Sequence, residues 1–120
     1  MNYAPDVKDR RLQVVVDAIG ADGLLKIGTA EMDTLLSVVR LSTPAFKVGG
    51  GEMNLVGQAN IDPRARASGK ARAAQITTAS GKVVVDGLSV GATDAEIILT
   101  SDEIREGQEV SIASGTIVHA

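Results

Sequence analysis

The chain has 120 residues, 44% of them hydrophobic and 22% charged, which is typical of a single globular domain. Aromatic residues make up only 2%, there is no cysteine, and the one histidine is His119. Disulfide scaffolds, cysteine zinc sites, thiol nucleophiles and most histidine-based catalysis are therefore excluded, and a net charge of −3 argues against a specific nucleic-acid binder.

An N-terminal helix is predicted over about residues 6–20. Asp6 follows a proline and is expected to cap the first turn, with Asp9 as its capping-box partner, while Gly20 ends the helix. Between them, apolar residues recur at helical spacing. This stripe consists of Leu12, Val15, Val16 and Ile19, widened by Val14 and Ala18. We expect the stripe to pack on a sheet. The alternative is that the apolar face of the helix binds in a groove of a partner.

Beyond the helix, apolar residues alternate with polar ones, which is typical of β-strands. The predicted strands are residues 24–28, 34–41, 52–57, 71–78, 82–88, 95–100 and 108–119, with turns at 79–81, 90–94 and 101–107 and a break or bulge at Gly115. Short strands with frequent turn signals are typical of a sandwich. Residues 1–120 are therefore expected to form one mainly β domain, an antiparallel β-sandwich or jelly-roll-like fold with the N-terminal helix packed on it.

Charge is unevenly distributed along the chain. Residues 61–72 are predicted to be an exposed loop that runs into a strand near Lys70. Residues 62–72 have a net charge of +3, whereas residues 94–109 have a net charge of −5. A domain with a basic edge and an acidic edge can associate head to tail, because opposite potentials steer encounter and fix the register. The candidate interface residues are Arg64, Arg66, Lys70 and Arg72 on one side and Glu103, Glu106 and Glu109 on the other. The alternatives are two unrelated solvated loops, or a weak contact of the basic loop with nucleic acid.

No motif singles out a catalytic, cofactor or metal site. A strand-like segment follows Gly49–Gly51, whereas a phosphate loop leads into a helix. The acids of residues 102–109 do not have the spacing of a calcium loop, and His119 lacks a triad or metal partner. Two carboxylates could still act as the catalytic pair of a hydrolase, but nothing in the sequence identifies such a pair. We therefore expect a protein without enzymatic activity, cofactor or metal.

No apolar run approaches the roughly 20 residues of a membrane span, and the first residues lack the features of a signal peptide. We therefore expect synthesis in a bacterial host cytoplasm and no membrane partner.

Several segments of the sequence, taken in order, resemble those of a known group of proteins. Ile-Gly-Ala-Asp-Gly-Leu-Leu-Lys-Ile follows the helix, Asp-Thr-Leu-Leu-Ser-Val-Val-Arg-Leu precedes Pro-Ala-Phe, and the end contains Gly-Gln-Glu-Val and Thr-Ile-Val-His. From about Asp9 to His119, the chain resembles a group of small virion structural proteins of tailed bacteriophages. It departs from the group at residues 60–75, where Arg and Ala replace aromatic residues. The resemblance implies a particle component without catalytic residues.

The expected function is that of a capsid decoration or cement protein located in the virion. It would bind the outer face of a phage head and bridge neighbouring subunits. Its expected partners are the major capsid protein or other virion subunits, together with further copies of the chain as a homo-oligomer. The alternatives are a tail, neck or fibre-attachment component, and a host-glycan-binding module in which Tyr3 and Phe46 are the only aromatic candidates for stacking on a sugar.

Overall fold

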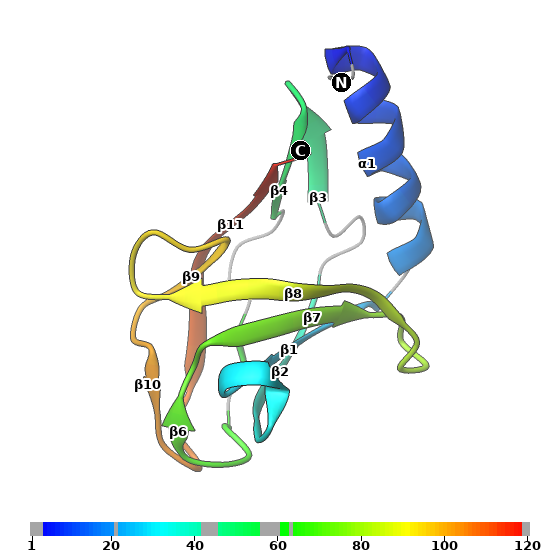
Figure 1. Cartoon of the computed structure of the whole chain (residues 1–120). Helices are drawn as coiled ribbons and strands as arrows, with labels where there is room; N and C mark the ends of the chain where they lie inside the picture. Colours follow the sequence, from blue (N-terminus) through cyan, green and yellow to red (C-terminus); the bar gives the residue numbers. More distant parts are fainter. Residues whose placement is uncertain (1–3, 21, 42–45, 56–60, 63, 119–120) are drawn as a thin grey trace.

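The computed structural model describes residues 4–20, 22–41, 46–55, 61–62 and 64–118, which contain one α-helix, one 3-10 helix and eleven strands (Figure 1). The predicted class, mainly β with one N-terminal helix, is confirmed. Tyr3 and His119 lie outside the described residues. In chain order the elements are α1 (Pro5–Ile19), β1 (Leu24–Gly28), the 3-10 helix η1 (Ala30–Met32), β2 (Leu35–Arg40), β3 (Phe46–Gly49), β4 (Glu52–Leu55), β5 (Ile61–Asp62), β6 (Gly69–Lys70), β7 (Ala73–Thr77), β8 (Val83–Gly91), β9 (Ile97–Leu99), β10 (Glu103–Ile104) and β11 (Val110–Val118).

Helix α1 begins one residue earlier than predicted. Pro5 occupies its first turn, where the fixed φ of proline suits the helix and its missing N–H costs nothing. The expectation that Asp6 caps the helix is wrong: Ala4 is the capping residue, without a side-chain bond, and Asp6 lies inside the first turn. Gly20, with φ of 69°, ends the helix as predicted.

The helix buries one face against the sheet. Leu12, Val16 and Ile19 are buried, with Val15 partly buried against the core, as the stripe predicts. Val14 and Ala18 do not widen this buried stripe, because both are exposed.

Asp9 joins the helix to a hairpin instead of completing a capping box. Its Oδ1 accepts a hydrogen bond of 2.7 Å from the backbone N–H of Gly51, in the turn between β3 and β4. Gly51 has φ of 79°, which favours glycine at this turn. The hairpin consequently lies alongside α1 (Figure 1).

Nine strands form one curled sheet. Its order is β2-β1-β7-β8-β9-β11-β4-β3, with β5 paired to β11. The neighbours are antiparallel, except that β8 and β9 are parallel, with Val90 opposite Ile97 and Gly91 opposite Ile98. The expectation of wholly antiparallel pairing is wrong at this pair. Strand β8 extends to Gly91, into the predicted turn at 90–94, and the loop that follows carries the chain back so that β9 runs in the same direction as β8 (Figure 1).

The curl brings one end of the sheet, strand β2, against β5. Strand β5 in turn pairs with β11. Asp62 of β5 bridges the gap: its Oδ2 accepts bonds from the Ser37 hydroxyl at 2.7 Å and from the Val38 N–H at 3.2 Å. The sheet is therefore closed by a side chain at this point, rather than by a continuous ladder of backbone bonds.

The core within this curl is aliphatic, as the composition requires. Its fully buried side chains include Leu25, Ile27, Leu36, Ile76 and Ile97, and one aromatic residue, Phe46, is 2% exposed. The last strand is continuous from Val110 to Val118, with its register shift between Ile112 and Ser114 and not at Gly115, where a bulge was predicted. Gly115 instead packs tightly, because a Cβ there would lie 3.2 Å from both Ile97 and Leu55.

Candidate interaction surface

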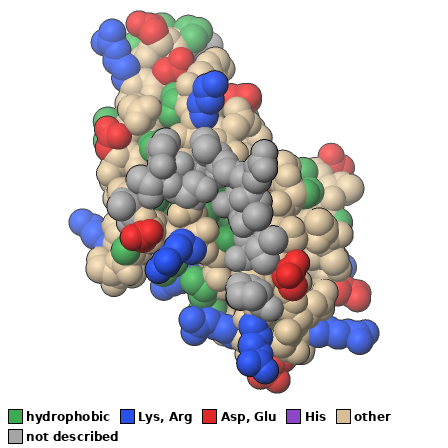
Figure 2. Space-filling model, turned by 180° about the vertical axis from the view of Figure 1, so that it is seen from behind, with side chains coloured by type: hydrophobic (Ala, Val, Ile, Leu, Met, Phe, Trp, Pro, Cys, Tyr) green, Lys and Arg blue, Asp and Glu red, His purple; other side chains and the backbone are tan. Residues whose placement is uncertain are grey.

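The basic and acidic segments singled out by their charge lie next to each other. Strand β6 of the basic segment pairs antiparallel with β10 of the acidic segment, and Lys70 is opposite Glu103. Lys, Arg, Asp and Glu side chains are interspersed at the lower end of the molecule in Figure 2. The expectation of a basic edge separate from an acidic edge is therefore wrong. Opposite charges and complementary backbone groups bring the two segments together within one chain.

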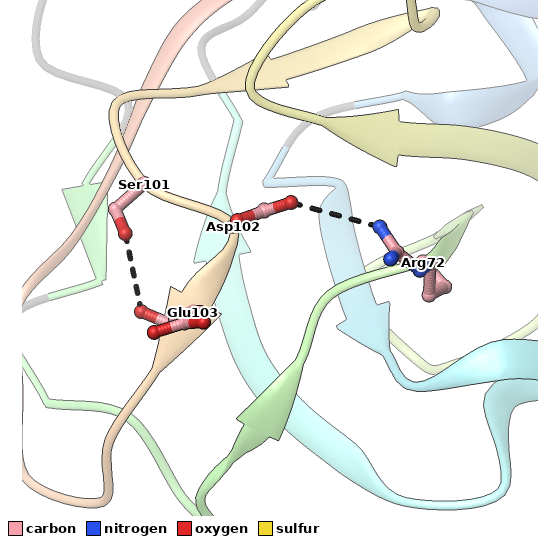
Figure 3. Close-up of polar contacts among 4 residues, drawn as sticks. All are labelled: Arg72, Ser101, Asp102 and Glu103. Atoms are coloured by element: carbon pink, nitrogen blue, oxygen red, sulfur yellow. Dashed lines mark hydrogen bonds and ion pairs between the residues drawn. The ribbon is translucent and has the colours of Figure 1, made fainter.

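An ion pair and a backbone bond reinforce this pairing just after β6. The N–H of Ala71 donates to the carbonyl of Asp102 at 2.7 Å, and the guanidinium of Arg72 lies 3.6 Å from the Asp102 carboxylate (Figure 3). The two side chains of the ion pair are 47% and 25% exposed, so solvent screens the pair and its contribution to stability is small.

Further bonds join the segments on the other side of β6. The N–H of Ala65 donates to the carbonyl of Gln108 at 2.8 Å, and that of Gly107 donates to the carbonyl of Ala65 at 2.9 Å. The N–H of Glu106 donates to the Ser68 hydroxyl at 2.8 Å. The two chain segments are thus bonded together along their length.

Three contacts fix the basic segment to the sheet. The Asp62 carboxylate accepts from the N–H of Arg64 at 3.0 Å, besides its bonds to β2. Farther along, the N–H of Arg66 donates to the carbonyl of Leu36 at 2.8 Å, and that of Arg72 donates to the carbonyl of Gly28 at 3.0 Å. The backbone that carries the basic side chains is therefore held in place by β1 and β2.

We call residues 62–72 and 102–109 together the charged edge. All of the predicted interface residues are exposed on it, namely Arg64, Arg66, Lys70, Arg72, Glu103, Glu106 and Glu109. The two segments contain five Arg or Lys and five Asp or Glu residues, so their formal charges cancel. The charged edge is therefore a neutral surface of mixed charges, and a hollow of about 280 Å³ lies beside Lys70, Glu103 and Arg105.

The charge pattern of the sequence does not single out the residues that hold the charged edge together. Asp62, Ser68 and Gln108 supply side-chain or backbone acceptors to the opposite segment or to β2. A local signal existed for Asp62, because an Asp whose side chain accepts from the N–H two residues later forms an Asx turn. The contacts of Ser68 and Gln108 join distant parts of the sequence and have no local signal.

Within the described residues, no group of three or more His, Asp or Glu side chains is arranged to hold a metal ion. The described part of the chain also contains no helix with the length and apolarity required to cross a bilayer. Comparison of the sequence and the structure with known protein families, curated proteins and solved structures finds no match.

Proposed function

We propose that this chain is a structural component of a bacteriophage particle, a capsid decoration or cement protein that binds the major capsid protein through the charged edge. The protein would bridge neighbouring subunits in many copies, so that individually weak contacts add up over the lattice. The resemblance to small virion proteins between Asp9 and His119 supports this assignment.

The observation that carries the proposal is the construction of the charged edge. Eight exposed charged side chains stand on backbone segments that are bonded to each other and to the sheet. A preordered surface loses less conformational entropy on binding than a flexible loop, and mixed charges select a partner with the complementary pattern. Both properties suit a protein that must occupy equivalent sites on a lattice.

The test is binding of the purified chain to phage particles that lack it, at low and high salt. Neutralising three acids of the charged edge, in E103Q/E106Q/E109Q, should lower the affinity about tenfold at low salt, with the difference shrinking at high salt. The matched control, E31Q/D33N/D86N, removes the same number of exposed acids outside the charged edge and should bind as the unmodified chain does. Equal occupancy of both variants at both salt concentrations would refute the role of this surface.

Copy number in purified virions separates the head from the alternatives within the particle. Hundreds of copies per virion support a decoration protein, whereas about a dozen would indicate a neck or fibre-attachment component. Absence from the virion would refute the proposal as a whole.

A further inference from the structure

The outer face of α1 carries two exposed valines that the core does not use. Val7, Arg10, Val14 and Asp17 follow each other at spacings of three and four residues and are all exposed. Val14 is 66% exposed and Val7 is 37% exposed. Leu12, Val16 and Ile19 point the opposite way into the core, so the helix has a second, outward face with valine at its centre.

A hollow lies beside Val14, the more exposed of the two valines. It has a volume of about 320 Å³, and Leu12, Val14 and Val15 line it together with Arg11. Its lining is mostly apolar, which suits an aliphatic side chain from another molecule better than a polar one.

One charge on this face, Asp17, is placed against the helix dipole, and its Oδ1 accepts a hydrogen bond of 3.1 Å from the Gln13 amide. Arg10 lies in the first half of α1, while Asp17 lies in the last turn, which has no basic residue. A helix C-terminus disfavours negative charge, so Asp17 is at an unfavourable position in the isolated chain. A basic side chain from a second helix that runs antiparallel would offset this cost.

We propose that this face binds a second copy of the same chain, with two α1 helices packed antiparallel across a two-fold axis at Val14. Arg10 and Asp17 lie on opposite sides of Val14, about 6 Å and about 4.5 Å from it along the helix axis. Two-fold symmetry therefore brings Arg10 of each copy next to Asp17 of the other and forms two equivalent ion pairs. The two Val14 side chains meet at the axis, beside the hollows of the two copies. This inference does not depend on the proposed function.

A contact of this size gives a weak dimer, because a single helix pair buries less area than a standard interface. Sedimentation velocity from micromolar to millimolar protein should show the mass rising toward that of a dimer. R10D and D17R should each weaken association about tenfold, since each creates two like-charge pairs. The double variant R10D/D17R should restore it. An equimolar mixture of the two single variants should associate more tightly than either alone, because both interchain pairs then join opposite charges.

The control is K82E, which reverses an exposed charge in the β7–β8 turn and should leave association unchanged. A mass that does not rise with concentration would overturn the proposal. So would single variants that associate as the unmodified chain does, or a mixture no tighter than its components.

Cross-linking provides a second test, because the chain has no cysteine of its own. V14C places one thiol at the symmetry axis, where two copies can form a disulfide. V83C, at a valine that is 47% exposed on β8, is the matched control. Under mild oxidation V14C should form covalent dimers at least tenfold faster than V83C. Equal rates would overturn the antiparallel arrangement.

Discussion

Replacing Asp62 with alanine should destabilise the protein more than replacing any exposed acid. Asp62 is only 8% exposed, and its carboxylate accepts hydrogen bonds from Ser37, Val38 and Arg64. The substitution leaves these three donors without an acceptor and removes the side chain that joins β5 to β2.

The size of the effect follows from the burial of each donor. The Ser37 hydroxyl is buried and the Val38 N–H is partly buried, and an unsatisfied buried donor costs about 1–3 kcal/mol. Arg64 is exposed, so its N–H can bond to water instead. The expected loss is therefore about 2–5 kcal/mol, a large part of the ~5–15 kcal/mol that stabilises a typical domain.

Urea unfolding followed by circular dichroism measures this loss as a lower midpoint with an unchanged slope. D62N should lose less, about 1–2 kcal/mol, because one oxygen remains to accept from Ser37 and Val38. D86A, at an exposed acid of β8, is the control and should change stability by less than about 0.5 kcal/mol.

A double-mutant cycle completes the test. S37A alone removes one of the three bonds, so D62A/S37A should cost about 1 kcal/mol less than the sum of the two single losses. A D62A variant as stable as D86A would refute the view that this carboxylate closes the sheet.

Three further substitutions test other contacts by the same unfolding assay. G115V should destabilise by about 1–3 kcal/mol, because even its Cβ would lie 3.2 Å from Ile97 and Leu55; a neutral effect would show that this packing is loose. D9A should cost about 1 kcal/mol by removing the 2.7 Å bond to Gly51, and increased protease cleavage in the β3–β4 turn would report the release of the hairpin from α1. D102N should change stability by less than about 1 kcal/mol, since its ion pair is solvent-screened; a larger loss would mean that the pair is better shielded than its exposure indicates.

The elements that the sequence predicts well are those whose own apolar pattern defines them. The helical stripe from Leu12 to Ile19 and the alternation of residues 24–28 need no distant partner to be recognised. Ile97 and Leu99 are buried while Ile98 is only partly buried, as alternation in the predicted strand 95–100 implies. These segments form the centre of the structure.

The elements that the sequence does not predict are defined by distant backbone partners. Strands β5, β6 and β10 have two residues each, too few for any periodicity to appear. The charged edge depends on β6 meeting β10 more than 30 residues later, and only the folded sheet creates that pairing. The sequence therefore shows which residues are charged, but it does not predict that the basic and acidic segments form one mixed surface.

The position of β11 has a consequence for how the protein reaches its native state. The last strand in the chain bonds to β9, β4 and β5, which come from three different parts of the sequence. Such long-range pairing makes folding slow, on the order of milliseconds to seconds. Until the β11 segment has been synthesised, the edges of β9, β4 and β5 lack this partner. Strand edges without a partner can pair with neighbouring chains, so folding intermediates in which β11 has not yet bonded are the states of this protein most exposed to aggregation.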